Sequence, residues 1–151
     1  MNIVEKVNEI VELQNPHEKE DKLEQLSSVF EHGRELNKEN IGRGTQILLN
    51  AVLQENSDDK EMREFFFHTI DSAVVFQNVG DRINWDTLVT ALSSLEKNLL
   101  EYALNVLGLS GQEQYLQVIE TYTHHSDPEI STWADEAINE LTYRLAHHPE
   151  S

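Results

Sequence analysis

The spacing of apolar residues constrains the fold of this chain more than any other feature of its sequence. Apolar side chains recur at intervals of three and four residues from one end to the other, as at Ile3, Val7 and Ile10. This interval puts them on one face of an α-helix, whereas a half-buried strand would alternate apolar and polar residues. Eight segments have such a stripe: residues 3–11, 23–30, 47–52, 62–74, 88–95, 99–107, 115–122 and 130–145. The sequence therefore predicts an all-α fold.

Short polar segments between the stripes carry the signals of helix ends. Asn15-Pro16 ends the first helix, because the residue before a proline avoids the helical conformation. Asp127-Pro128 opens the last helix, with an aspartate that can cap the first turn and a proline whose missing N–H costs nothing there. Because the connections are short, we expect neighbouring helices to form antiparallel hairpins.

Three further local signals concern helix starts. Asp58 with Glu61, and Ser110 with Glu113, have the spacing of a capping box, in which each residue bonds the other's backbone. The glycine pair within residues 42–44 predicts an irregular first turn in the third helix, because glycine is a weak helix former.

The carboxy-terminal part of the chain repeats an apolar pattern. At a distance of 31 residues, Leu99, Ala103 and Leu107 are matched by Ile130, Ala134 and Ile138. The unit from Tyr115 to Leu141, in which a helix is followed by a Ser-Asp-Pro start and an alanine-containing second helix, resembles a HEAT repeat. The resemblance implies helical hairpins stacked as a short α-solenoid, clearest over residues 85–145. The period is 37 residues further upstream, so an irregular helical bundle is the alternative.

A chain of 151 residues is the usual length of one domain, and we expect a single domain over residues 1–151. Its net charge is −17, from 28 acidic and 11 basic residues, whereas solubility needs a magnitude of only roughly 2–8. Residues 98–151 contain nine acidic side chains and one basic side chain, Arg144. This field repels nucleic acid and anionic membranes and favours a basic protein as partner. A charge that only keeps the protein soluble is the alternative.

The location expected from the sequence is the cytoplasm. The chain has no cysteine, so disulfides and thiol chemistry are excluded. The first residues alternate apolar and charged side chains and lack the apolar core of a signal peptide. No run approaches the roughly 18 apolar residues of a membrane span.

Candidate catalytic and metal-binding patterns are weak, and we expect neither an enzyme nor a bound metal or cofactor. The pairs His124-His125 and His147-His148 are neighbours in sequence, which point to different sides of a helix and do not chelate together. His68 and Asp71 have the spacing of an acid–base pair, but such spacing is common. Gly42 and Gly44 lack the strand and the Lys-Ser/Thr of a phosphate-binding loop.

The chain resembles, in size, charge and helix pattern, the helical immunity proteins of bacterial contact-dependent inhibition and polymorphic-toxin systems. The resemblance implies a protein that binds a toxin nuclease domain and occludes its basic active site with an acidic surface. Aromatic side chains would anchor such a contact. The partner-binding residues that we predict are Trp85, Asp86, Asp127, Glu129, Trp133, Asp135, Glu136, Glu140 and Tyr143. A HEAT-like scaffold or adaptor protein is the alternative function.

Overall fold

The structure is a computed structural model that describes residues 2–54 and 59–147. Within these residues the chain forms eight α-helices, three short 3-10 helices and no strand, so the all-α prediction is confirmed. The α-helices are α1 (Ile3–Glu12), α2 (Pro16–His32), α3 (Lys38–Gln54), α4 (Lys60–Gln77), α5 (Asp86–Ala91), α6 (Lys97–Gly108), α7 (Leu116–Glu120) and α8 (Pro128–Ala146). The 3-10 helices are η1 (Gly80–Arg82), η2 (Leu92–Ser94) and η3 (Glu113–Tyr115).

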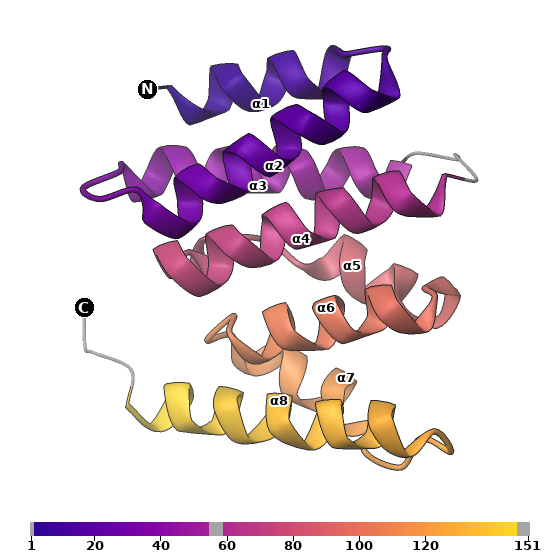
Figure 1. The fold of residues 1–151 in the computed structure, drawn as a ribbon. Coiled ribbons are helices and arrows are strands. Elements are labelled where there is room, and N and C mark those ends of the chain that lie inside the picture. Colours follow the sequence, from indigo (N-terminus) through magenta and orange to yellow (C-terminus); the bar gives the residue numbers. More distant parts are fainter. Residues whose placement is uncertain (1, 55–58, 148–151) are drawn as a thin grey trace.

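Helices two apart in chain order pack on one another (Figure 1). In one layer α1 packs on α3 and α3 on α5, and in the other α2 packs on α4, α4 on α6 and α6 on α8. We call the second layer the even layer. This order is compatible with a short α-solenoid, in which each helical pair stacks on the one before it, and with a helical bundle. The stack becomes irregular towards its end, because α5 has 6 residues and α7 has 5.

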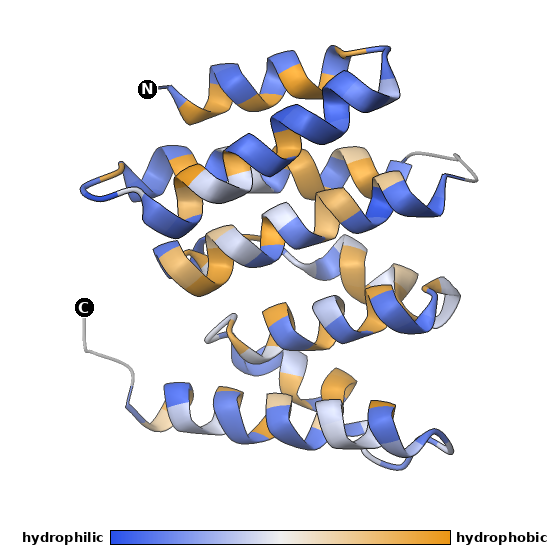
Figure 2. Ribbon diagram, in the orientation of Figure 1, coloured by the Kyte–Doolittle hydropathy of each residue, from blue (hydrophilic) through white to orange (hydrophobic). Residues whose placement is uncertain are grey.

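The core follows the apolar stripes of the sequence. Buried apolar side chains form one cluster from Ile3 in α1 to Leu141 in α8, and the largest of them are Trp85, Phe30 and Phe66. Figure 2 shows apolar and polar residues alternating along each helix, which is the pattern of a helix with one buried face. In the described part of the chain, no helix has the length and apolar character needed to cross a membrane.

Side-chain caps begin five of the described helices, which are α1, α2, α3, α4 and α8. Asp127 caps α8 and is followed by proline in the first turn, as predicted. Asn15, which was predicted only to end the first helix, also caps α2 in the same way. At α4 the cap is Asp59, whose carboxylate accepts a hydrogen bond from the N–H of Met62 at 3.0 Å. The predicted capping residue, Asp58, lies outside the described residues.

The capping box predicted at Ser110 is wrong. The Ser110 hydroxyl donates a hydrogen bond to the carbonyl of Leu107 at 2.7 Å and accepts one from the N–H of Gln112 at 3.2 Å. Ser110 therefore closes the end of α6 instead of opening the next helix. That next element begins as the 3-10 turn of η3, with no side-chain cap.

The irregular turn predicted in the third helix is also wrong, because α3 continues through Gly42 and Gly44 without a break. Both glycines are buried. A Cβ atom on Gly44 would lie 2.9 Å from Cγ2 of Ile3 and 3.2 Å from Cγ2 of Val7. Gly44 thus allows α1 to approach α3 closely, and its role is in packing.

Small residues likewise bring α6 and α8 together. A Cβ atom on Gly108 would lie 2.9 Å from Cα of Ala137. Ala103 and Ala134, which the repeat alignment matched, are both fully buried. The backbones of α6 and α8 can therefore lie close together, and the side chains beside this contact border a common surface.

Candidate protein-interaction site

A groove of about 460 Å³ lies on the even layer, where α4, α6 and α8 meet. Its lining combines carboxylates, an amide, two aromatic rings and small apolar side chains. We call it the acidic groove, and its residues are Asp71, Glu101, Tyr102, Asn105, Leu109, Trp133, Glu136, Ala137 and Glu140.

Helical spacing places these side chains along the groove. On α8, Trp133, Glu136 and Glu140 recur at intervals of three and four residues, so that they share one face of the helix. Ala137 lies among them and is the residue that packs against Gly108. The groove therefore follows the line along which α6 and α8 come closest.

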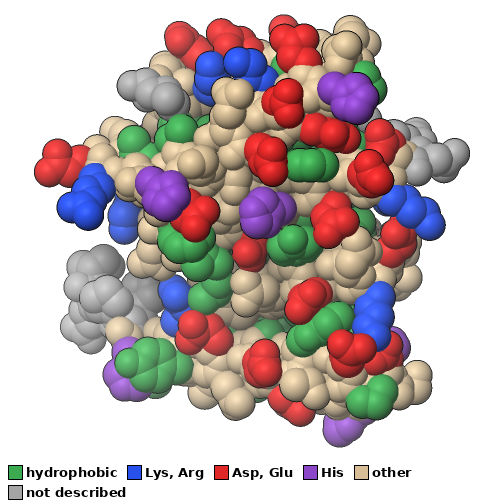
Figure 3. All heavy atoms as spheres, in the orientation of Figure 1, with side chains coloured by type: hydrophobic (Ala, Val, Ile, Leu, Met, Phe, Trp, Pro, Cys, Tyr) green, Lys and Arg blue, Asp and Glu red, His purple; other side chains and the backbone are tan. Residues whose placement is uncertain are grey.

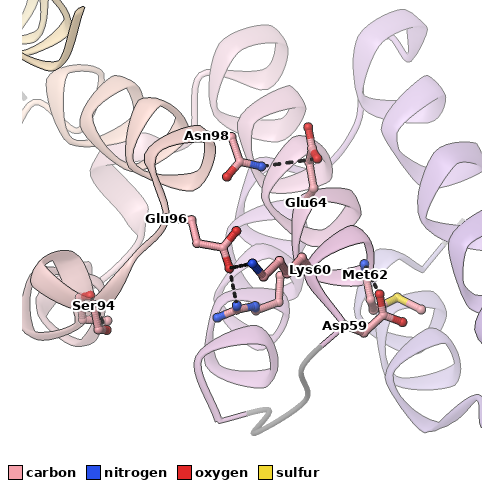
Figure 4. A network of polar contacts seen from close by, with 9 residues as sticks. Asp59, Lys60, Met62, Glu64, Ser94, Glu96 and Asn98 are labelled. Carbon is pink, nitrogen blue, oxygen red and sulfur yellow. Dashed lines mark hydrogen bonds and ion pairs between the residues drawn. The ribbon is translucent and has the colours of Figure 1, made fainter. Parts of the chain in front are cut away.

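Two amide–carboxylate hydrogen bonds join α6 to α4. The Nδ2 of Asn105 donates to Oδ1 of Asp71 at 2.7 Å, and the Nδ2 of Asn98 donates to Oε2 of Glu64 at 3.4 Å. Figure 4 shows the second of these bonds. The two asparagines are seven residues apart on α6, and the two acids are seven residues apart on α4, which is two helical turns in each case. The two bonds thus fix the register of α4 against α6.

Asp71 is a partly buried carboxylate of the groove. Burial raises its pKa above the ordinary value, while the hydrogen bond from Asn105 and the nearby His68 act in the opposite direction. Burial dominates because the charged form loses hydration that one amide donor does not replace. An approaching cation would therefore find a carboxylate that is partly desolvated.

Tyr102 lies between the acidic groove and a second, smaller hollow. Burial raises the pKa of its hydroxyl, and the negative charges of Glu64, Asp71 and Glu101 raise it further. The hollow has a volume of about 270 Å³ and is lined by Glu24, Glu61, Glu64, Phe65, His68 and Tyr102. Acidic and aromatic side chains thus continue from α8 across α6 and α4 to α2.

Two basic side chains at the start of α4 are paired with an acid at the start of α6. Figure 4 shows Glu96 beside Lys60, with which it forms an ion pair of 3.8 Å, and Arg63 lies 3.0 Å from the same carboxylate. Figure 3 shows acidic side chains spread over the even layer and Lys and Arg mainly at its margins. Among the described residues, no ion pair involves Glu101 or Glu136. Their charges face solvent uncompensated.

Trp133 already contacts a cation of the protein itself. Its ring is half-buried, and Nζ of Lys97 lies 5.8 Å from the ring centroid. A cation at this distance is attracted by the negative face of the ring.

The structure brings only some of the predicted binding residues together. Trp133, Glu136 and Glu140 line the acidic groove. Asp135 and Tyr143 are exposed on α8 but do not line it. Tyr143 is 60% exposed and stacks on His147, with ring centroids 4.1 Å apart.

Asp127 and Glu129 lie at the start of α8, where both bind Lys97. The Lys97 ammonium is 2.9 Å from Asp127 and 2.7 Å from Glu129. The hydrogen bond from Lys97 lowers the pKa of Asp127, and the bonds to Glu129 and Asp127 raise the pKa of Lys97. These two carboxylates are therefore less available to a partner than those of the groove.

Trp85 was wrongly predicted to contact a partner. It is 0% exposed, and its Nε1–H donates a hydrogen bond to the carbonyl of Gly80 at 2.9 Å. Asp86 is exposed, but it belongs to α5 in the other layer and accepts a hydrogen bond from the hydroxyl of Tyr115 at 2.8 Å. Both residues stabilise the junction between the η1 turn and η3, away from the groove.

Six groove residues were not among the predicted binding residues: Asp71, Glu101, Tyr102, Asn105, Leu109 and Ala137. The seven-residue spacing shared by Glu64 with Asp71 and by Asn98 with Asn105 is a signal that could have indicated two of them. His68 and Asp71, considered as an acid–base pair, line the smaller hollow and the acidic groove respectively.

No group of three or more potential metal ligands occurs among the described residues. The Nδ1 of His125 accepts a hydrogen bond from the N–H of Asp127 at 3.0 Å, and the ring of His147 bonds the carbonyl of Tyr143 at 2.8 Å. These two histidines thus belong to the two ends of α8. His148 lies outside the described residues.

Comparisons of the chain with protein-family models, with curated proteins and with solved structures found no match. Function is therefore argued from the site itself.

Proposed function

We propose that this protein is an immunity-type inhibitor that binds a basic protein partner, a toxin nuclease domain, through the acidic groove of the even layer. The observation that carries the proposal is the groove itself. It gathers four carboxylates, from Asp71, Glu101, Glu136 and Glu140, beside two aromatic rings in one concave surface.

Charge makes a basic protein the best partner for this surface. The net charge of −17 accelerates encounter with a positively charged protein and opposes binding to nucleic acid. Aromatic side chains in a concave site supply contact area at a small cost in conformational entropy. The groove thus offers both electrostatic attraction and apolar anchors.

Inhibition follows from the same physics. A nuclease must hold phosphates in a basic cleft, so an acidic surface that fits this cleft competes with the substrate. Such a protein would act in the cytoplasm of the cell that it protects. The choice of a toxin as partner rests on the resemblance in size, charge and helix pattern to immunity proteins.

The test is binding and inhibition with the purified carboxy-terminal domain of the protein encoded immediately upstream. We expect tight binding that weakens as salt is raised and that stops nuclease activity. Binding without inhibition would favour a scaffold or adaptor role for the same groove. Absence of binding would contradict the proposal.

A further inference from the structure

We propose that the acidic groove is a site for an arginine side chain, which a basic partner inserts beside Tyr102 and Trp133. This site deepens the proposed function and rests on it only in assigning the arginine to a toxin partner. The volume of about 460 Å³ falls within the roughly 300–1,000 Å³ of small-ligand pockets.

The first argument is charge complementarity across three helices. Asp71 comes from α4, Glu101 from α6, and Glu136 from α8, so that a cation in the groove is approached from several sides. Within the described chain, Glu101 and Glu136 form no ion pair, whereas Glu140 lies 3.7 Å from Arg144. The groove therefore contains negative charge that the protein does not neutralise.

The second argument is that the lining suits arginine better than lysine. A guanidinium group is planar and weakly hydrated, so it stacks on aromatic rings and also binds carboxylates in pairs. The groove offers the rings of Tyr102 and Trp133, apolar contact from Leu109 and Ala137, and several carboxylates. An ammonium group, which is compact and strongly hydrated, would use only the charge.

The third argument comes from contacts already present in the protein. Trp133 has Lys97 at 5.8 Å from its ring centroid, so its ring takes part in a cation contact within the fold. Asp71 accepts a hydrogen bond from Asn105 at 2.7 Å, which leaves lone pairs of its carboxylate for further donors. The five N–H donors of a guanidinium group can supply them.

The experiment compares two peptides, acetyl-(Gly-Arg)₃-amide and acetyl-(Gly-Lys)₃-amide, in NMR titrations of the ¹⁵N-labelled full chain. We expect the indole signal of Trp133 and the side-chain amide signal of Asn105 to shift with the arginine peptide. The signal of the buried Trp85 should stay in place and report that the fold is intact. We expect the arginine peptide to bind about fivefold more tightly than the lysine peptide.

Variants localise the effect. Asp71→Asn and Trp133→Leu should each weaken the arginine peptide about fivefold and reduce its advantage over the lysine peptide. Trp133→Phe is the second variant at that position, with an intermediate loss. Glu113→Gln, an exposed change outside the groove, is the control and should alter nothing.

Equal affinity for the two peptides, or unchanged binding in the groove variants, would overturn the arginine site. These results are separate from the test of function. Arginine binding without inhibition of the upstream toxin would support the arginine site and contradict the proposed function. Inhibition without a preference for arginine would support the proposed function and contradict the arginine site.

Discussion

At the scale of single residues, Asp71 illustrates a conflict between binding and stability. Burial raises the pKa of its carboxyl group, which means that the ionised form costs folding free energy at neutral pH. The hydrogen bond from Asn105 offsets part of this cost. A carboxylate with a raised pKa in a concave surface is typical of a functional site.

We expect Asp71→Asn to raise the melting temperature at pH 7. The amide can still accept the hydrogen bond from Asn105, and no charge is then buried. The difference from the natural chain should shrink as the pH falls through the raised folded-state pKa of Asp71, because the carboxyl group in the folded protein then becomes neutral, as the amide is. It should vanish below the unfolded pKa. Circular dichroism melts between pH 8 and 3 measure this; a lower melting temperature at pH 7 would contradict it.

Trp85 is a structural residue, and we expect Trp85→Phe to destabilise the protein by about 1–3 kcal/mol. The variant removes buried contact area and the N–H that bonds the carbonyl of Gly80. Urea unfolding measures the change. A loss of partner binding in the folded variant, with little change in stability, would show instead that Trp85 belongs to the binding surface.

At the scale of helices, the contact between α6 and α8 depends on the absence of a side chain at Gly108. A Cβ atom there would meet the backbone of Ala137, which cannot move aside as a flexible side chain would. Because the groove follows this contact, a change in the separation of α6 and α8 would also change the width of the groove.

We expect Gly108→Ala to destabilise the protein by about 1–3 kcal/mol, although alanine is the better helix former. Gly42→Ala is the comparison, since its Cβ would lie 3.2 Å from Cβ of Arg82, a smaller overlap than the 2.9 Å to Cα of Ala137 at Gly108. Chemical unfolding of both variants measures the difference. Equal effects would mean that the close approach of α6 and α8 is not required.

The start of α8 depends on Asp127, which caps the helix and binds Lys97. We expect Asp127→Ala to lower the melting temperature at pH 7 more than Asp127→Asn, because asparagine keeps the cap. The pKa of Asp127 is lowered in the folded protein, so its stabilisation is present above the unfolded pKa and is lost as the pH falls through the folded pKa. An effect of Asp127→Ala that stays constant down to pH 2 would contradict this account.

Helix positions were predictable from the sequence because each stripe and each cap is a local signal. Ser110 was misread because serine occurs at both the starts and the ends of helices. Gly44 was misread because glycine both weakens helices and allows close packing. Only the approach of α1 to α3 decides the role of Gly44. Trp85 was misread for a similar reason, since its burial depends on Tyr115 and Gly80, which come from different elements.

At the scale of the whole molecule, the two-layer stack places α4, α6 and α8 side by side. The groove residues on α8 could be predicted, because Trp133, Glu136 and Glu140 lie on one face of a single helix. The groove residues on α4 and α6 could not be predicted, because this requires knowing which helices are neighbours in space. Acidic side chains are spread over the face formed by the even layer (Figure 3).

The most direct measurement is the rate of association with the upstream toxin domain as a function of salt, for two charge-matched double variants. Glu101→Gln with Glu136→Gln changes the acidic groove, and Glu9→Gln with Glu113→Gln changes exposed positions in α1 and η3. We expect the groove pair to lower the rate about tenfold at low salt and to flatten its salt dependence, and the control pair to change it less than about twofold. Equal effects of the two pairs would contradict the assignment of binding to the groove.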